Sequence, residues 1–477
     1  MRLNITRLMH TALPLAVLLL TACGGTTRYI TIGGNVSGLT GTGLTGSVEL
    51  QDNGGDNLTV PVNAVNGAFT FATQAASFEN VYNVTVLTQP AGQTCIVTNG
   101  SGTTTTNVTS VVVNCGPTTP RYAYVVNAGS NDISQYTIAA NGTLTALATA
   151  TVTAGLSPYS ITVVPSGLNA GKYAYVANKG GNNVSEYNIN SGVLTLNTTV
   201  TPTGTVNAGS SPYSITVDPS GQYVYVANEG SNDISQYTIA ANGTLTLAPA
   251  TIPAGTNPVS ITVDPLGPYV YVANYGSNTV SQYTIVGGAL TPMSPPTVLA
   301  GTNPYSVTVD PSGKYAYVVN AGGNDISQYT IGAGGALTAM SAVPAFATMP
   351  TPTVAPAGMN PASVTVDPKG PYAYVANFGD GTVSQYTISA GGALTAMTIA
   401  TIPAGTNPYS ITVDPLGQYV YVANEGGNNV SQYTIGTPSS STPGALTTMS
   451  AVPVVTTMAT ATTVAAGAQP ISVITAQ

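Results

Sequence analysis

Residues 212–239, with the sequence PYSITVDPSGQYVYVANEGSNDISQYTI, recur along the chain and constrain its fold more than any other feature. Successive repeats are 46 to 57 residues apart, as between Asn228 and Asn274 and between Asn320 and Asn377. Such a period, with several short strands in each repeat, is typical of propellers, solenoids or arrays. The Tyr-Val-Ala/Val-Asn piece ends at Asn127, Asn178, Asn228, Asn274, Asn320, Asn377 and Asn424, and the Pro-x-Ser-Ile/Val piece starts at Pro158, Pro212, Pro258, Pro304, Pro361, Pro408 and Pro470.

One repeat predicts four strands, a to d, over residues 214–217, 223–227, 234–239 and 245–252. Residues 218–221, Asp-Pro-Ser-Gly, are typical of a type I turn between strands a and b. Both faces of each strand carry Val, Ile, Tyr or Thr, so the sheet has to be covered on both faces, as in stacked propeller blades. The absence of an amphipathic helical pattern from Tyr122 onward argues against a β-α solenoid.

The ends of the repeat region distinguish a ring from an open array. The region starts on strand b at Tyr122 and stops on strand a at residues 471–474. Pairing of these two segments completes the last blade and leaves no free edge. We therefore predict an all-β fold in which residues 121–477 form a seven-bladed β-propeller closed by its N- and C-terminal strands.

The repeat resembles the YVTN family of β-propellers, which overlaps the lactonase-like (6-phosphogluconolactonase-like) propellers. The residues that carry the resemblance are YVVN and YVAN, the ITVDP and VTVDP strand ends, and SQYTI, over residues 121–477. The resemblance implies the propeller fold, and it implies activity only weakly, because the family includes enzymes and many proteins with no known activity. The absence of Trp disfavours a WD-repeat propeller.

The composition excludes several classes of partner. Charged residues make up only 5% of the 477, and the net charge is −8. With no basic run, nucleic acid is not an expected partner. No apolar run of spanning length follows the leader described next. We expect a monomer whose ligand is a protein, a peptide or a glycan.

The first residues have the pattern of an export leader, residues 1–22. Arg2 and Arg7 precede a short apolar run over residues 13–20. Leu20-Thr21-Ala22-Cys23 resembles the bacterial lipobox, so we expect Cys23 to be lipidated, to anchor the chain in the membrane and to start a tether over residues 23–27. The alternative is an ordinary signal peptide with an incidental cysteine. Gly24 after the cysteine favours the outer membrane, so we expect the protein in the bacterial cell envelope.

Residues 28–116 form a separate predicted module, joined to the repeats by a linker over residues 117–120. About ninety residues with alternating strand patterns indicate a small immunoglobulin-like β-sandwich. Cys95 and Cys115 lie in this module, and in an exported protein such a pair predicts a disulfide. The strand-like runs cover residues 29–32, 47–50, 68–71, 82–86 and 110–113.

Two long connections interrupt the otherwise short loops, and we place both between strands c and d. They cover residues 332–357 and 436–466 and resemble each other, ALTAMSAVPAFATMPTPT and ALTTMSAVPVVTTMATAT. This likeness indicates a duplicated insertion and not an independent binding loop.

Residues repeated in every blade are interpreted as structural. We expect the seven Asn side chains to satisfy backbone groups of turns, and the Asp before Pro at 218, 264, 310, 367 and 414 to do the same at the a–b turn. We predict no metal and no cofactor. Ca²⁺ bound by a repeated Asp set is the alternative, although no EF-hand or nonapeptide spacing is present.

The position after the repeated Asn departs from the repeat and faces the mouth of the predicted channel. Its residues predict a small polar and aromatic binding pocket, with Tyr159, Tyr213, Tyr305 and Tyr409 around it; the alternative is neutral drift on a solvated turn. The candidate ligand-binding residues are Lys179, Glu229, Tyr275, Phe378 and Glu425, while blades 1 and 5 carry Ala128 and Ala321 there.

Catalysis meets a shortage of suitable residues. The only His lies in the leader, so no Ser-His or Cys-His nucleophile can be built, and we predict no catalytic residue. The resemblance associates His, Glu and Arg with lactonase activity, and only Glu is present at this mouth. We therefore expect a binding or scaffold protein. The alternative is a lactonase-like hydrolase, including a metal-dependent one with Glu229, Glu425 and Asn side chains as ligands.

Overall fold

The computed structural model divides the chain into two compact units, residues 1–119 and 120–477. Within the described ranges, no helix has the length and apolar character needed to cross a membrane, and the 3₁₀ turn η1 (Gly167–Asn169) is the only helical segment. Cys23 lies outside the described residues. The structure describes residues 29–37, 47–61, 67–71, 75–76, 80–88, 93–104, 106–117, 121–139, 141–199, 201, 203–340, 354–437, 440, 442–449 and 462–476.

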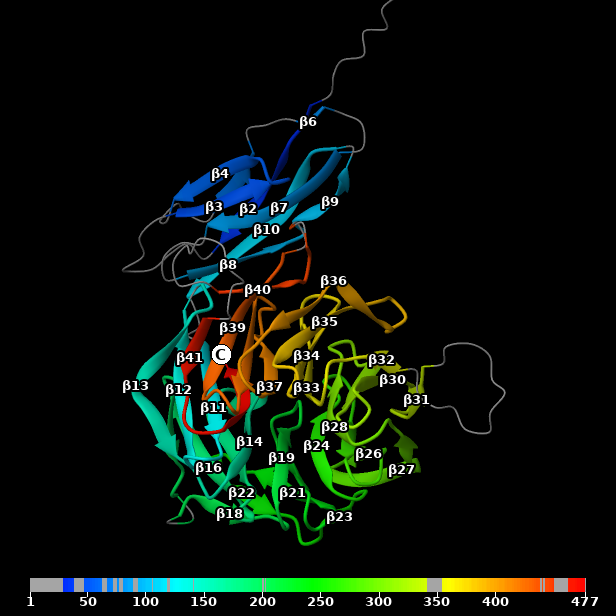
Figure 1. Ribbon diagram of the computed structural model, residues 1–477. Helices are drawn as coiled ribbons and strands as arrows, with labels where there is room; N and C mark the ends of the chain where they lie inside the picture. The colour runs from blue at the N-terminus through cyan, green and yellow to red at the C-terminus, as the bar shows by residue number, and fades with distance from the viewer. Residues whose placement is uncertain are drawn as a thin grey trace, which may run out of the picture. The chain divides into compact units, whose positions relative to one another are not determined.

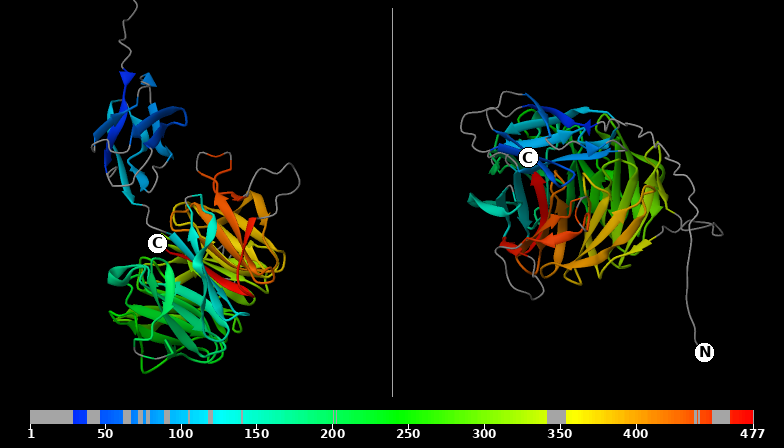
Figure 2. Two further views of the ribbon diagram at one scale, coloured as in Figure 1. Left: turned by 90° about the vertical axis from the view of Figure 1, so that its left-hand side faces the viewer. Right: turned by 90° about the horizontal axis from the view of Figure 1, so that it is seen from above.

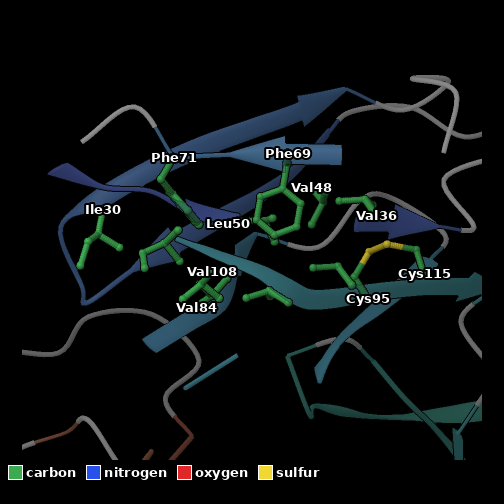
Figure 3. Close-up of a cluster of buried hydrophobic side chains, with 13 residues drawn as sticks. Ile30, Val36, Val48, Leu50, Phe69, Phe71, Val84, Cys95, Val108 and Cys115 are labelled. Carbon is green, nitrogen blue, oxygen red and sulfur yellow. A yellow bond between two sulfur atoms is a disulfide. The ribbon is translucent and has the colours of Figure 1, made fainter. Parts of the chain in front are cut away.

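The first unit contains two four-stranded sheets, counted over its described residues, and a short pair, β1 with β6. Side chains from both larger sheets meet in one buried cluster, in which Val48 and Leu50 lie with Phe69 and Val108 (Figure 3). One sheet has the order β5 (Gly67–Thr70), β2 (Ile32–Ser37), β10 (Val108–Pro117) and β8 (Gln93–Thr98); the other has the order β4 (Asp56–Pro61), β3 (Ser47–Asp52), β7 (Asn80–Thr88) and β9 (Ser101–Thr104); the short pair is β1 (Tyr29–Ile30) and β6 (Ala75–Ala76).

The predicted disulfide is present in this unit. Cys95 of β8 lies directly opposite Cys115 of β10, and the two sulfurs are bonded. The bridge therefore joins neighbouring strands of one sheet. Both cysteines belong to the buried cluster, so the bond lies within the hydrophobic core of this unit (Figure 3).

The second unit forms seven antiparallel sheets from its described residues, which we call blades 1 to 7. Figure 1 shows the innermost strands of blades 2 to 7 around a common centre; they are β14, β19, β24, β28, β33 and β37. From the inside outward, the strands of blades 1 and 2 are, in blade 1, β42 (Pro470–Ala476), β11 (Arg121–Asn127), β12 (Asp132–Ile138) and β13 (Leu144–Thr153), and in blade 2, β14 (Pro158–Val163), β15 (Tyr173–Asn178), β16 (Asn183–Asn190), β17 (Val193–Leu196) and β18 (Thr205–Asn207). Those of the next three blades are, in blade 3, β19 (Pro212–Val217), β20 (Tyr223–Asn228), β21 (Asp233–Ile239), β22 (Leu245–Leu247) and β23 (Ile252–Pro253); in blade 4, β24 (Pro258–Val263), β25 (Tyr269–Asn274), β26 (Thr279–Val286) and β27 (Ala289–Leu299); and in blade 5, β28 (Pro304–Val309), β29 (Tyr315–Asn320), β30 (Asp325–Ile331), β31 (Leu337–Ala339) and β32 (Val354–Pro356). Those of the last two are, in blade 6, β33 (Pro361–Val366), β34 (Tyr372–Asn377), β35 (Thr382–Ile388) and β36 (Leu394–Pro403), and in blade 7, β37 (Pro408–Val413), β38 (Tyr419–Asn424), β39 (Asn429–Ile435), β40 (Leu446–Thr448) and β41 (Thr462–Ala465).

The second strand of each blade is buried on both faces, which is why its sequence varies least. In β20 every residue after Tyr223 is buried, and the same holds for the matching strands of the other blades. Its Val, Tyr and Ala side chains pack against the neighbouring blade on either side. A strand covered on both faces favours apolar residues at every position, and this explains the lack of polar alternation.

Each blade is fixed to the next by side chains that bond to backbone groups. The Gln135 Oε1 of blade 1 accepts the backbone N–H of Leu194 in blade 2, at 2.7 Å. The same bond occurs at all seven blade interfaces, including Leu144 N–H to Gln432 between blades 1 and 7. The hydroxyl of the second Tyr in YVYVAN donates to a glycine carbonyl of the next blade, as from Tyr225 to Gly288 at 2.9 Å.

The glycine at this contact is required by the turn. Gly243, at the turn between the third and fourth strands of blade 3, has a φ of +79°. A Cβ built on it would lie 2.3 Å from the ring of Tyr173 in blade 2. Any other residue would strain the turn and collide with the ring, so the Asn-Gly pair serves both the turn and the blade interface.

Strand β42, from the C-terminal segment, is the inner strand of blade 1. It pairs antiparallel with β11, with Val473 opposite Val125, and Figure 2 shows it in red beside the cyan strands of that blade. It also lies beside β37 of blade 7 and β14 of blade 2. A buried ion pair crosses the same seam between blades 7 and 1, from Arg121 to Asp414 at 2.7 Å.

The position predicted for the two insertions is wrong. Residues 337–339 and 354–356 form β31 and β32, and both pair with β30. The insertion of blade 5 therefore interrupts the outer strand and does not precede it; β40 and β41 flank the second insertion of blade 7 in the same way. The outer strand has a neighbour on one side only, so an interruption at its register shift leaves the inner strands intact.

The Glu186→Gln substitution is expected to stabilise the protein at pH 7. Glu186 occupies the interface position that holds Gln in the other six blades, it is 3% exposed, and burial raises the pKa of its carboxyl. A raised pKa means that the folded state holds the proton more tightly than the unfolded chain. The contribution of Glu186 is therefore fully present below its ordinary pKa and is lost as pH rises. The gain on substitution should be small near pH 4 and about 1 kcal/mol at pH 7 in thermal or denaturant unfolding.

The reverse change at a matched position is the control. Gln236→Glu in blade 3 places a carboxyl at the same kind of interface and should destabilise at pH 7 more than at pH 4. An unchanged or lower stability of Glu186→Gln at pH 7 contradicts this account.

Removal of residues 469–477 is expected to destabilise the second unit strongly. The buried Ile471 and Val473 would be lost, and burial of two such side chains contributes roughly 3 kcal/mol or more. The unpaired edge of β11 would also promote aggregation. A synthetic peptide of residues 469–477 should raise the unfolding temperature of the truncated protein. A truncated chain that melts like the full one shows that the β42 pairing does not hold the ring together.

Candidate functional site at the channel mouth

The repeated Asn side chains position the turns that surround the mouth. In blade 2 the Asn178 amide donates to Asn183 Oδ1 and Ser185 Oγ across the turn between strands b and c. Its oxygen accepts the backbone N–H of Gly155 from the d–a loop, at 3.1 Å. Asn178 thus ties together the two loops that meet at this end of the blade. The structural interpretation is confirmed for five of the seven asparagines, whose oxygens accept a glycine N–H in this way, whereas the buried oxygens of Asn127 and Asn228 have no partner among the described residues. It is also confirmed for Asp218, which accepts three backbone N–H groups of the a–b turn.

In blades 2, 4 and 6 the residue after the Asn lies against the first strand of the following blade. The ring of Tyr275 in blade 4 packs edge-on against Tyr305 in blade 5, with centroids 6.0 Å apart. Phe378 in blade 6 packs in the same way on Tyr409 in blade 7, at 6.1 Å. We call the residues after each Asn, together with the x residue of each Pro-x-Ser, the mouth. Both aromatic residues proposed from the sequence therefore belong to it.

The tyrosines predicted to surround a pocket instead meet at its centre. The hydroxyls of Tyr213, Tyr305 and Tyr409, from blades 3, 5 and 7, are hydrogen-bonded to one another. Their side chains are too large for the channel to stay open where the hydroxyls meet. Burial raises the pKa of Tyr305 to about 12 and that of Tyr213 further, so all three stay neutral near pH 7. This prediction is corrected: three of the four tyrosines fill the space, because side chains as long as Tyr reach the channel axis from three blades.

The channel beside the three tyrosines is narrow. Its cavity of about 110 Å³ is lined by the x residues and by the serines of the seven Pro-x-Ser segments. Six of the serine oxygens accept a backbone N–H group of the next blade, as Ser260 does from Val307 at 3.1 Å. Small-molecule sites usually occupy about 300–1,000 Å³. A ligand of sugar size therefore has to bind above the tyrosines and not inside the channel. We call this outer part of the mouth, around the three tyrosines, the rim.

Charged residues of the rim come from neighbouring blades. Lys179 Nζ lies 2.7 Å from Glu229 Oε2, and the two side chains are 28% and 26% exposed. The same ammonium lies 4.8 Å from the ring centre of Tyr159 and 4.6 Å from that of Tyr213. The sequence placed both charged residues at the mouth, and the structure pairs them. A cation over two aromatic faces is held at a fixed place on the rim.

Glu425 lies at the matching position of blade 7, two blades along the ring from Lys179. Burial raises the pKa of its carboxyl. Within the described part of the chain, no hydrogen bond or ion pair joins this carboxylate to another residue. The carboxylate can thus accept a proton without first breaking a bond. The sequence singled out this residue only because it departed from the repeat.

The pairing of mouth positions could have been found in the sequence. The x residues of Pro-x-Ser are Tyr in four blades, and they are Val259, Ala362 and Ile471 in the others. Comparison of x in one blade with the residue after Asn in the preceding blade would have identified these contacts. Among the residues that the structure describes, no three His, Cys, Asp or Glu side chains gather as a metal site.

Known proteins share this architecture. A protein-family model described as "Lactonase, 7-bladed beta-propeller" matches residues 80–299 and 283–460. No curated protein matches the chain by sequence. Solved structures with the same fold include a putative 6-phosphogluconolactonase of Bacteroides fragilis, with 17% identity and a TM-score of 0.59 over 76% of this chain and 99% of that one. They also include the periplasmic gluconolactonase of Pseudomonas aeruginosa, with 17% identity and a TM-score of 0.59 over 75% and 99%, and a Lactobacillus plantarum protein, with 21% identity and a TM-score of 0.58 over 75% and 99%.

These structural likenesses show the fold. The family match goes further, because it covers most of the chain, including most of the repeat region. The chain belongs to the lactonase family of seven-bladed β-propellers.

Proposed function

We propose that this protein hydrolyses a lactone on the rim of the mouth. The observation that carries the proposal is the Glu425 carboxylate, which burial makes more basic and no described side chain engages, in a propeller of the lactonase family. From the sequence we expected a binding or scaffold protein, and here we prefer the alternative, a lactonase-like hydrolase. The family match favours the lactonase-like alternative, and the unengaged carboxylate of Glu425 supports the choice of this residue as the base.

Ester hydrolysis needs a base for water and a positive group for the developing oxyanion. In our proposal Glu425 removes a proton from water as its oxygen bonds to the lactone carbonyl carbon. The Lys179 ammonium stabilises the negative charge on the carbonyl oxygen. When the tetrahedral intermediate collapses, the ring C–O bond breaks and the proton passes from Glu425 to the leaving alkoxide. The product is the open hydroxy acid, with all atoms accounted for.

The aromatic rim supplies binding area for a sugar-derived ring. Tyr275 is 37% exposed, and with Phe378 and Tyr159 it presents ring edges and faces around the three central tyrosines. Such rings pack against the C–H faces of sugars, while hydroxyl and carboxylate groups fix their orientation. This arrangement supports a compact, polar ligand held at the surface.

Binding without turnover is the second candidate. It is favoured by the Lys179–Glu229 ion pair, because a cation already paired with a carboxylate is a weaker oxyanion stabiliser. It is also favoured by the chain's only His, which lies in the leader. A glycan, peptide or protein ligand would then occupy the same aromatic rim.

We also propose an exported, lipid-anchored protein of the cell envelope. In this proposal residues 1–22 are the leader, Cys23 carries the lipid, and residues 23–27 are a tether. Residues 28–116 form an immunoglobulin-like spacer, and residues 117–120 link it to a propeller over residues 121–477 that β42 closes. The Cys95–Cys115 bond supports export, because disulfides persist outside the reducing cytosol.

Mature protein should hydrolyse simple aldonolactones, and Glu425→Gln should lower kcat by about 100-fold, because general-base assistance contributes about that much. Lys179→Met should lower kcat to a similar extent. Proton release on lactone opening, followed with a pH indicator, measures both. Lys314→Met, at the opposite end of blade 5, is the control and should leave kcat unchanged. Turnover that survives Glu425→Gln excludes the proposed base, and absent turnover with saturable lactone binding in calorimetry selects the binding candidate.

The mature N-terminus should be an acylated Cys23. Mass spectrometry of the protein purified from membranes of a bacterial host should find this residue first, with the mass of attached acyl chains. Cys23→Ser should release the protein into the soluble fraction. A mature chain that begins elsewhere, or an unmodified Cys23, disproves the anchor and leaves the function of the propeller unaffected.

A further inference from the structure

We infer that the mouth selects an uncharged lactone and rejects its phosphorylated counterpart. The inference rests on the proposed function, because it names the class of substrate that acts at the same site. It concerns a choice that the fold does not settle, since solved structures with this fold include a putative 6-phosphogluconolactonase and a gluconolactonase. The distribution of charge over the two ends of the blades decides between them.

Positive charge is scarce at the mouth. Three of the chain's eight basic residues, Arg2, Arg7 and Arg28, precede the described strands. Arg121 is engaged by Asp414. The remaining four are lysines, and three of them lie in a–b turns, at the end of the blades opposite the mouth: Lys172, Lys314 and Lys369.

The fourth is Lys179, so it is the one basic residue that the described chain places at the mouth. Its ammonium is already paired with Glu229 at 2.7 Å and packed over two tyrosine rings. A phosphate monoester carries nearly two negative charges and is usually bound by several donors, often an arginine fork. Here it would meet one cation whose charge is already balanced.

Negative charge surrounds the same rim. Lys179, Glu229 and Glu425 together give a net formal charge of −1. The b–c turns around them add carboxylates that are held by hydrogen bonds, such as Asp132 with Asn127 and Asp233 with Asn228. In blade 6, Asp380 accepts the backbone N–H of Met359. A phosphate dianion approaching this rim is repelled, whereas an uncharged sugar lactone is not.

The test compares glucono-δ-lactone with its 6-phosphate as substrates of the mature protein. The kcat/KM for the neutral lactone should exceed that for the phosphate by about 100-fold at low salt, and the ratio should shrink as salt screens the rim. Glu229→Gln frees the charge of Lys179 and should reduce the ratio about tenfold. Lys314→Met changes a charge at the end of the blades opposite the mouth and should leave the ratio unchanged.

Each other outcome decides between the two proposals. Equal or faster hydrolysis of the phosphate overturns the charge inference and leaves the lactonase function standing. If neither lactone is hydrolysed, the lactonase function fails, and calorimetry with glucose and glucose 6-phosphate then tests the mouth alone. Tighter binding of the sugar phosphate, or no binding of either sugar, overturns the charge inference as well.

Discussion

The structure depends on hydrogen bonds that run from side chains of one blade to backbone groups of the next. At every interface a Gln or Glu of the third strand accepts the N–H of a leucine at the start of the neighbour's outer strand. Only 5% of the residues are charged, so ion pairs cannot set the register between blades. Van der Waals packing of Val and Ala tolerates sliding, whereas a buried hydrogen bond with no alternative partner does not. These bonds therefore fix how far each blade is rotated against the next.

The same bonds explain why the repeat is nearly invariant and where it is free to vary. Tyr, Gln, Asn and Gly recur because each contacts a backbone group or ring of a neighbouring blade, as Gly243 contacts Tyr173. The residue after the Asn and the x residue of Pro-x-Ser take no part in those bonds. Side chains at these positions can differ between blades without loss of those bonds, and the positions surround one end of the channel. The candidate site therefore lies at positions whose side chains are not needed for the hydrogen bonds between blades.

Much of the site could be predicted from the repeat alone. Lys179, Glu229, Tyr275, Phe378 and Glu425 were identified because they depart from it, and the structure places the first four in contacts at one mouth. The pairing of Cys95 with Cys115 followed from a count of cysteines. The position predicted for the two insertions was wrong. Each insertion divides the outer strand in two, and in the sequence the short first half could not be distinguished from a loop that precedes the strand.

The sequence by itself determined the number of blades, the strands within each blade and the residues that vary at the mouth, because all of these follow from a periodic pattern. Only the tertiary structure decided what those varying residues do. Tyr213, Tyr305 and Tyr409 lie 92 and 104 residues apart and meet at the channel axis, so that a predicted pocket is filled. Lys179 and Glu229 neutralise each other across two blades. These contacts between residues of different blades depend on how each blade is rotated against the next, and a local sequence pattern does not specify that rotation. They determine both the space and the charge available to a ligand at the mouth.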